Sequence, residues 1–476
     1  MRVVLVHPSG SNWVPGKRDV TVVANRMVPI GLLSIASYLE SHGLEVLVYD
    51  CLGPRAHGDV DAKVARILSL EPDLLGFSTT TSGFLDACEM AEKVRRARPL
   101  LKNVFGGVHV SGVGAQLMER FPEIDYLALG EGELTLLELA RGESPRGIEG
   151  LVWRDGGEVV TNPPRSRIRD LDSLPFPAYE KLDGFPRGYR LPPFSYVRTP
   201  GTALSTSRGC IYQCSYCDRS VFRRGFRSNS AEYVYEHMKY LRERFGIRHV
   251  SIYDDLFTVD RKRVMSLCER LATEQIGVQF NCAVRVGYTD DGLLEGLKEA
   301  GCLMVSVGIE SGDPKQLERL KAGVTLETVR DTIASIQTKG LRAKGLFMMG
   351  VVGDTEESIR RTSDFVIELG LDDMNMSKFT PFPGAPCWDT IRAEGSFDED
   401  WRLMNCLNFV FVPKGVESRE RLEQLYNEHV KRFYTDPGWR KKLRKRIWQH
   451  RRTLCHMLVH LPAFLSARQH FDPRAR

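Results

Sequence analysis

The sequence predicts an α/β protein built from two series of alternating strands and helices, which a proline-rich stretch separates. In each series, short apolar runs alternate with longer amphipathic segments, over residues 1–145 and again over residues 201–390. Strands and helices that alternate in this way form parallel sheets with right-handed crossovers. Residues 146–200 contain repeated prolines and little such alternation, which predicts a linker.

Length and composition narrow the class of protein. The chain has 476 residues, too many for one hydrophobic core, and its 42% hydrophobic and 27% charged residues are ordinary for a globular protein. A net charge of +5 argues against nucleic acid as a partner of the whole chain. The N-terminus lacks the pattern of a signal peptide, and no stretch reaches the ~20 apolar residues that span a bilayer. We therefore expect a cytoplasmic protein, in which cysteine clusters bind metal rather than form disulfides.

The first series predicts a Rossmann-like domain. Strands are expected at residues 3–6, 45–49, 73–78, 103–105 and 126–129, and helices at 30–41, 60–70, 84–96 and 134–141. Ligands of such sheets bind at the carboxyl ends of the strands. Small and hydroxyl-bearing residues gather at these ends, in Ser78-Thr79-Thr80, Gly106-Gly107 and Gly130-Glu131-Gly132. A short hairpin is also expected within residues 150–160.

The second series predicts a partial (β/α)6 barrel of the TIM type. Its six strands are expected at residues 204–207, 249–253, 278–284, 304–309, 344–349 and 374–379. The chemistry of such barrels takes place at the carboxyl ends of the strands. The rest of the chain, residues 391–476, is expected to be a helical region that ends in a basic segment.

Three cysteines follow the first strand of the barrel. Cys210, Cys214 and Cys217 form a C-x3-C-x2-C motif, and Gly209 before them allows a tight turn. Three thiolates on one short loop can reach three irons of a [4Fe–4S] cubane. No fourth cysteine lies nearby, which leaves one iron open to a small ligand, as a catalytic cluster requires. The alternative is a zinc site, although zinc sites usually combine two ligand pairs and no second pair is close in the sequence.

This motif, with Tyr216 inside it and a (β/α)6 barrel around it, resembles the radical S-adenosylmethionine (SAM) superfamily. The resemblance implies that the open iron binds SAM and that one electron, from a reductase, flavodoxin or ferredoxin, cleaves SAM to methionine and a 5′-deoxyadenosyl radical. It also implies SAM contacts near the loop and at the barrel strand ends, from Tyr216, Asp254, Arg285, Glu310, Ser311 and Gly350. The alternative for Asp254 and Glu310 is a structural role, as helix caps or partners of Arg285 or Lys344.

The first domain resembles the cobalamin (B12)-binding domain that precedes the barrel in one radical SAM subgroup. Its glycine-rich strand ends carry the resemblance, together with Pro175-Phe176-Pro177 and Pro381-Phe382-Pro383-Gly384. The resemblance implies cobalamin contacts from Ser78, Thr79, Thr80, Gly106, Gly107, His109, Gly130, Glu131 and Gly132. The alternatives are that these glycines only permit tight turns and that His109 is satisfied by the backbone.

One departure concerns the cobalt ligand. Many B12 domains have a D-x-H-x-x-G motif whose histidine coordinates cobalt, whereas this sequence has Asp50-Cys51-Leu52-Gly53, with Leu52 at the histidine position and His57 a few residues later. Two outcomes stay open: cobalamin bound without a histidine ligand, or a vestigial B12 fold that only docks against the barrel.

The basic C-terminal segment combines positive charge with an apolar stripe. Arg and Lys are frequent between Arg440 and Arg452, and apolar residues recur at near-helical spacing: Trp439, Leu443, Ile447, Leu454 and Leu458. Such a helix can make peripheral contact with an anionic membrane surface, including the inner membrane face. It can equally cover an anionic substrate or pack its apolar stripe onto the barrel.

The resemblance implies a B12-dependent radical SAM enzyme that modifies an unactivated carbon of a small-molecule or lipid-like substrate. We expect methyl transfer through methylcobalamin. The alternative outcome is oxidative cyclisation or ring rearrangement of a tetrapyrrole or lipid-like substrate, as in the anaerobic magnesium-protoporphyrin ester cyclase. An iron–sulfur electron carrier or redox sensor without turnover is the alternative from another class. The general acid and base residues cannot be identified from the sequence.

Overall fold

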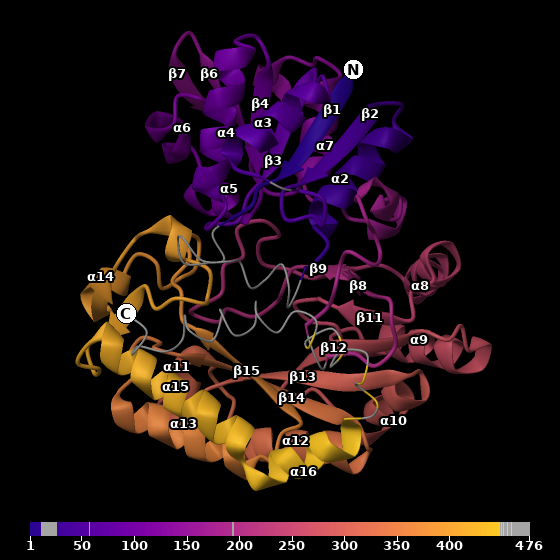
Figure 1. The fold of residues 1–476 in the computed structure, drawn as a ribbon, viewed down its shortest axis with the longest axis vertical. Helices are drawn as coiled ribbons and strands as arrows, with labels where there is room; N and C mark the ends of the chain where they lie inside the picture. Colours follow the sequence, from indigo (N-terminus) through magenta and orange to yellow (C-terminus); the bar gives the residue numbers. More distant parts are fainter. Residues whose placement is uncertain are drawn as a thin grey trace.

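A computed structural model of the chain describes residues 1–10, 26–56, 58–192 and 195–447, together with residues 449, 451, 455 and 458. It contains two α/β units, one above the other in Figure 1, with the C-terminal helices along the base of the lower unit. Both predicted sheets are present. His57 and Leu454 lie outside the described residues.

The N-terminal sheet has the order β2-β1-β3-β4-β5-β6-β7. Its strands β1 (Arg2–His7), β2 (Glu45–Asp50), β3 (Leu74–Ser78), β4 (Lys102–Gly106) and β5 (Tyr126–Ala128) are parallel. Strands β1 and β3 are buried almost throughout, as expected for a parallel sheet with helices on both faces. The strand order reverses between β1 and β3, because β2 is added on one side of β1 and β3 on the other. The loops at such a switch point form ligand sites.

The helices of this unit match the predicted segments closely. They are α2 (Ile30–Ser41), α3 (Val60–Ser69), α4 (Phe84–Ala97) and α7 (Gly132–Ala140), to which the structure adds the short α5 (Val108–Val113) and α6 (Gln116–Arg120). The predicted hairpin is present as β6 (Leu151–Asp155) and β7 (Glu158–Thr161), and it pairs antiparallel onto β5. The first sheet therefore extends past residue 145, where the sequence analysis places the start of the linker.

The lower unit is the predicted open barrel. Its six parallel strands follow chain order: β8 (Gly201–Leu204), β11 (His249–Ile252), β12 (Gln279–Arg285), β13 (Cys302–Glu310), β14 (Arg342–Met349) and β15 (Asp373–Lys378). The outer helices are α8 (Ala231–Phe245), α9 (Arg261–Glu274), α10 (Asp291–Glu299), α11 (Pro314–Leu320), α12 (Leu326–Thr338) and α13 (Glu356–Glu368). Local signals set their ends: the Ser230 hydroxyl caps α8, and Gly246 closes it in the left-handed conformation.

The C-terminal region is less helical than predicted. Residues 391–418 contain only short elements: α14 (Ile391–Glu394), the 3-10 helix η4 (Trp401–Leu403) and an antiparallel pair, β16 (Gly395–Phe397) and β17 (Phe411–Pro413). We call residues 380–410 the strap, because they leave the barrel, contact the N-terminal unit and return. Trp401, Met404 and Val410 of the strap are buried in the N-terminal core.

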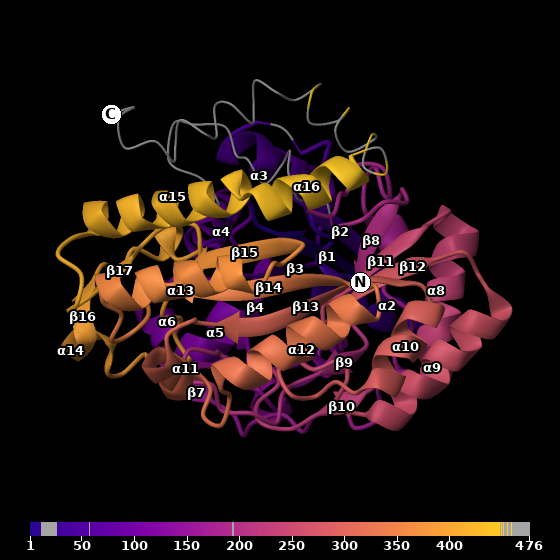
Figure 2. The same ribbon diagram turned by 90° about the horizontal axis from the view of Figure 1, so that it is seen from below.

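The true C-terminal helices are α15 (Arg419–Thr435) and α16 (Pro437–Arg446). Figure 2 shows them in line with each other beside the edge strand β15. Asp372 forms ion pairs with Arg446 at 2.7 Å and with Lys442 at 3.4 Å, and Trp439 packs against Phe433. The start of the basic segment thus packs onto the barrel, as one of the predicted alternatives has it. Within the described residues, no helix is both long and apolar enough to cross a bilayer.

Candidate active site

The cysteine loop is closed at its base by a two-stranded ribbon. Strands β9 (Ser207–Arg208) and β10 (Arg227–Ser228) pair antiparallel, so the loop between them leaves and returns at one point. Gly209 has a φ of +87°, and a Cβ there would lie 2.5 Å from the carbonyl oxygen of Gly225. Only glycine fits this close approach.

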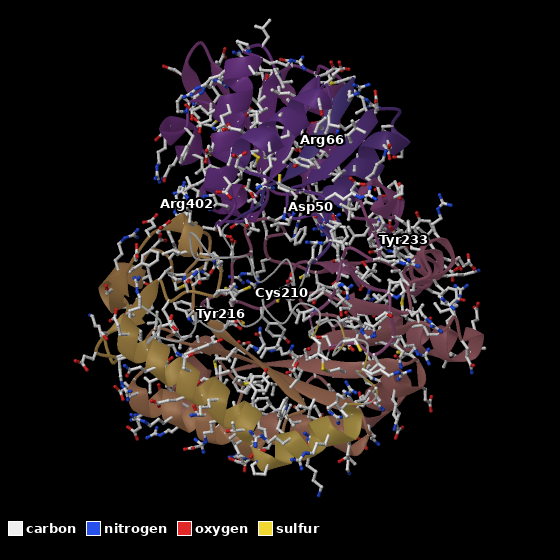
Figure 3. All side chains as sticks on the ribbon, viewed as in Figure 1. Asp50, Arg66, Cys210, Tyr216, Tyr233 and Arg402 are labelled. Atoms are coloured by element: carbon white, nitrogen blue, oxygen red, sulfur yellow. The ribbon has the colours of Figure 1, made fainter. Side chains whose placement is uncertain are left out.

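The three predicted cluster ligands project from this loop and are half-buried. Figure 3 shows Cys210 below the N-terminal unit, in the middle of the molecule. Burial raises the pKa of the Cys210 thiol and raises that of Cys217 to about 12, so bound iron would have to displace the protons. Among the described residues, no three Cys, His, Asp or Glu side chains are grouped to hold a single metal ion, the three cysteines included. Three thiolates on one loop remain the ligand set expected for a [4Fe–4S] cubane with one open iron.

Two of the predicted SAM-binding positions face the cysteine loop. The Arg285 guanidinium lies 4.0 Å from the Cys214 sulfur and stacks 3.7 Å from the Tyr212 ring centre. Glu310 hydrogen-bonds the Tyr216 hydroxyl and pairs with Lys321 at 2.9 Å. Glu310 also has a φ of +72°, a strained conformation for a residue other than glycine, and such strain concentrates at functional sites.

Asp254 and Ser311 are bonded inside the protein instead. The Asp254 carboxylate, 7% exposed, accepts the Thr206 N–H at 2.6 Å and the Ser207 N–H at 3.2 Å. The Ser311 hydroxyl lies 3.2 Å from that of Thr362 and accepts the Asp313 N–H. Both side chains thus shape the strand ends, and their predicted SAM contacts stay predictions.

Gly350 and Asp255 lie just after two further strands of the barrel, β14 and β11. The Gly350 N–H donates to Asp354, and a Cβ at Gly350 would lie 2.9 Å from Leu422. This glycine therefore serves close packing of the C-terminal region. Asp255, the neighbour of Asp254, is exposed and helps to raise the pKa of Cys217.

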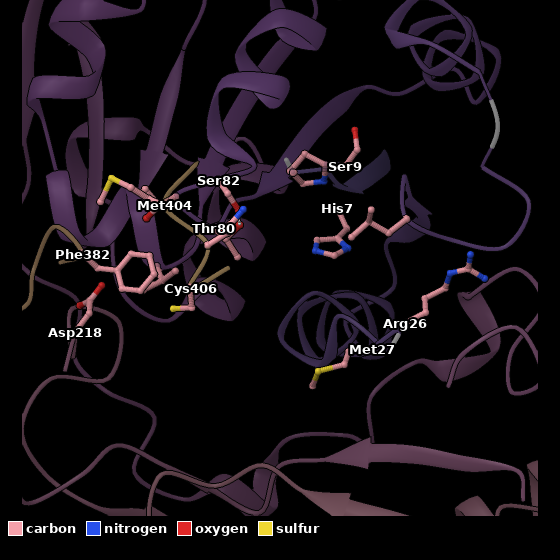
Figure 4. A pocket seen from close by; sticks show the side chains of 16 residues that line it. His7, Ser9, Arg26, Met27, Thr80, Ser82, Asp218, Phe382, Met404 and Cys406 are labelled. Carbon is pink, nitrogen blue, oxygen red and sulfur yellow. Dashed lines mark hydrogen bonds between the residues drawn. The ribbon is translucent and has the colours of Figure 1, made fainter. Parts of the chain in front are cut away.

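Two cavities lie at the carboxyl ends of the N-terminal strands. The larger, of about 450 Å³, lies between the two units. Figure 4 shows Thr80 and Ser82 on one side of it, close to Cys406 of the strap, and His7 on the other. Leu52 also lines it, and the His7 ring is held by a 2.8 Å contact with Asp50.

The smaller cavity is a slot of about 130 Å³ inside the N-terminal unit. It is lined by most of the predicted cobalamin-binding residues, namely Ser78, Gly106, Gly107, Gly130, Glu131 and Gly132. A Cβ at Gly106 would make ordinary van der Waals contact with Ala128, at 3.6 Å from its carbonyl oxygen, so no clash requires glycine there. An open, glycine-lined slot beside a larger cavity fits a corrinoid with a nucleotide-like tail.

Thr79 and His109 do not line either cavity. Thr79 is 2% exposed, and both its N–H and its hydroxyl donate to the carbonyl of Gly106. His109 is 1% exposed and packs between Phe84 and Trp401, at centroid distances of 4.6 Å and 4.5 Å. Burial lowers the pKa of His109 to about 3. Both side chains thus have partners within the protein, and their predicted cobalamin contacts stay predictions.

Comparison with known proteins agrees with this geometry. The chain matches the model of the Radical SAM superfamily over residues 204–366 and that of the B12 binding domain over residues 16–140. It is 30% identical to a protein of Pyrococcus horikoshii described as an uncharacterized methyltransferase, over 94% of this chain and 95% of that one. The chain belongs to the B12-binding radical SAM family. It is thus a radical SAM enzyme, and the family's cofactors are a [4Fe–4S] cluster, SAM and cobalamin.

Other members of the family are more distant. The anaerobic magnesium-protoporphyrin IX monomethyl ester cyclase of Cereibacter sphaeroides is 25% identical, over 91% of this chain and 70% of the cyclase. The solved structure of the radical SAM methyltransferase TsrM from Kitasatospora setae has a TM-score of 0.64 and 22% identity, covering 82% of this chain and 75% of TsrM. That likeness shows the fold of this radical SAM protein. Membership of an enzyme family leaves the electron-carrier alternative without support.

Proposed function

We propose that this chain transfers a methyl group from cobalamin to an unactivated carbon of a small-molecule substrate. The observation that carries the proposal is the cavity of about 450 Å³ between the units, because its wall combines loops of the B12-binding domain with Asp218, next to the cysteine loop's last ligand. A corrinoid held there would lie beside the cluster. The methyltransferase description of the P. horikoshii relative supports the same chemistry.

When bound, the cluster supplies the electron that cleaves SAM, and cobalamin supplies the methyl group. The residues of this chain would hold and orient both groups. The three loop cysteines would hold the cluster, Arg285 would face the SAM carboxylate, and Asp255 would face its amino group. Glu310 would hold the ribose, since Lys321 and Tyr216 already fix its carboxylate.

The test is anaerobic turnover of the reconstituted enzyme with dithionite, cobalamin and SAM that carries a deuterated methyl group. Methyl transfer predicts three products: 5′-deoxyadenosine from radical cleavage, S-adenosylhomocysteine from methyl donation, and deuterium in the substrate. An intact cluster that yields no 5′-deoxyadenosine would refute the radical SAM activity. Formation of 5′-deoxyadenosine without S-adenosylhomocysteine would refute methyl transfer but leave the radical SAM activity standing.

That last result would favour the second candidate, oxidative cyclisation or rearrangement of a tetrapyrrole or lipid-like substrate. Its support is the 25% identity to the Cereibacter sphaeroides cyclase, which extends over nearly the whole chain. A flavodoxin, ferredoxin or dedicated reductase is the proposed electron donor in either case.

Cytoplasmic location with peripheral membrane contact also belongs to the proposal. Its support is α16, which has no buried residue and carries Arg440, Lys441 and Arg444 among its basic side chains. Sedimentation with vesicles that contain about 30% phosphatidylserine would detect such contact. We propose domain boundaries near residues 161, 200 and 390, because the β6–β7 hairpin belongs to the first sheet.

A further inference from the structure

One carboxylate of the B12-binding domain reaches the base of the cysteine loop. Glu131 precedes α7 and is 6% exposed. Its Oε1 lies 2.6 Å from Nη1 of Arg208, and its Oε2 lies 3.0 Å from Nη1 of Arg227. The N–H of Ile168, from the linker, also donates to Oε2 at 3.2 Å. Glu131 thus joins the two domains and the linker at one point.

The two arginines occupy the two ends of the cysteine loop. Arg208 lies two residues before Cys210, and Arg227 is its direct partner in the β9–β10 ribbon. Like charges that face each other across antiparallel strands repel. Their side chains are only 14% and 13% exposed, so water screens this repulsion weakly. The shared carboxylate of Glu131 offsets this repulsion and so stabilises the pairing of β9 with β10.

Glu131 differs from its neighbour Glu133 in this respect. Glu133 bonds Arg208 at 2.6 Å and the Ser34 hydroxyl at 3.0 Å, but it does not reach Arg227. Within the described residues, Glu131 is the acidic partner of Arg227, whose Nε and Nη2 are buried without a hydrogen bond. The charge of Arg227 is therefore balanced mainly by Glu131.

The same residues form one wall of the slot in the B12-binding domain. Glu131 and Glu133 line it from the domain side, and Arg208, Val221 and Phe222 line it from the cysteine loop. A ligand in the slot would touch both the carboxylates and the loop that holds the cluster. The slot is thus lined in part by the loop that carries the three cysteines.

We propose that Glu131 is a positioning residue that fixes both ends of the cysteine loop against the B12-binding domain and so couples occupation of the slot to the cluster. The sequence analysis expected Glu131 to contact cobalamin; here its main partners are two arginines of the barrel. The coupling part of the proposal rests on cobalamin occupying the slot, whereas the positioning part does not.

The test compares the full-length variants E131Q and E138Q after anaerobic cluster reconstitution. Glu138 is a matched control, because it lies on α7 and pairs with Arg165 at 3.1 Å without touching the cysteine loop. The first readout is the rate of iron release to a ferrous chelator. We expect release at least tenfold faster from E131Q than from E138Q and the parent. Equal rates, within twofold, would overturn the positioning role.

The second readout is the electron paramagnetic resonance spectrum of the reduced cluster. A general loss of stability would lower the amplitude of this signal but would not shift its g-values. We expect hydroxocobalamin to shift the g-values of the SAM-bound cluster in the parent and in E138Q but not in E131Q. A shift of the same size in E131Q would overturn the coupling. If the parent bound no cobalamin, the proposed function and the coupling would both fail, and iron release would still decide the positioning role.

A second variant covers poor folding of E131Q. The double variant E131Q/R227Q removes the carboxylate together with the charge that it balances, so we expect near-parental thermal unfolding. Its iron release should remain at least tenfold faster than that of E138Q, because the ends of the loop are still unfixed. Parental iron release from this double variant would contradict the proposal.

Discussion

The contact of the strap with the B12-binding domain gives the sharpest prediction about the architecture. Trp401 is 5% exposed and packs against His109 at 4.5 Å, Phe84 at 5.6 Å and Phe121 at 6.2 Å, while the Arg120 guanidinium lies 4.6 Å from its ring centre. We predict that W401A detaches the strap from the N-terminal unit, because no other side chain would fill this aromatic site.

The magnitude follows from these contacts. Removal of a buried Trp or Phe side chain costs about 3–5 kcal/mol, and the cation–π contact adds about 1 kcal/mol. A loss of about 4 kcal/mol raises the population of the opened strap roughly 1000-fold. W401F keeps an aromatic ring in the site and should lose much less, on the order of 1–2 kcal/mol.

Hydrogen exchange followed by mass spectrometry measures this opening directly. Peptides from residues 380–410 should exchange two to three orders of magnitude faster in W401A, whereas peptides from α9 of the barrel should not change. Acceleration below tenfold in the strap would refute the docking energy. Equal acceleration in α9 would refute the idea that the strap opens separately.

Three further predictions concern single sites. Alanine at any one cysteine of the C-x3-C-x2-C motif should abolish the cluster absorbance and 5′-deoxyadenosine formation, whereas C387A should keep both; a cluster retained after loss of a motif cysteine would contradict the assignment. Burial raises the pKa of Asp354 to about 6, above its ordinary value, so the folded protein binds a proton at Asp354 more tightly than the unfolded chain does. The free energy of unfolding should therefore fall by up to about 3 kcal/mol as the pH rises from 4 to 6. Denaturant unfolding of D354N should lack this part of the pH slope, and identical slopes would argue against it. G107A should lose at least 1–3 kcal/mol, roughly the cost of the strained backbone, because Gly107 has a φ of +101° and its Cβ would lie 2.5 Å from the Thr79 carbonyl oxygen; unchanged unfolding would refute this.

The sequence predicts what depends on neighbours in the chain. The helix over residues 30–41 and the cysteine motif were identified because periodicity and ligand spacing are local properties. The Asp155-Gly156-Gly157 turn predicted a hairpin, but nothing local indicated that the hairpin would extend the first sheet. The sheet that a strand joins depends on distant residues.

The surroundings of the candidate site residues depend on distant parts of the chain for the same reason. Asp254 and Asp255 are adjacent, and only the register of β11 decides which carboxylate is buried under Thr206. Glu131 stands among glycines that indicated a ligand groove, yet its partner Arg208 is 77 residues away. His109 was expected to reach a cofactor, and the residue that covers it, Trp401, comes from the opposite end of the chain.

The strap means that the two units are held together at two places, by the linker and by the contact of residues 380–410 with the N-terminal unit. With two tethers, the units cannot separate by swinging about a single hinge, and each tether keeps the other's contact at high effective concentration. A fragment that ends near residue 390 would retain both sheets and the cysteine loop, but it would lack Met404, Asn405 and Cys406 from the wall of the larger cavity. Exchange of either unit between relatives would therefore have to include the strap, because the cavity is completed by a segment that lies outside both sheets.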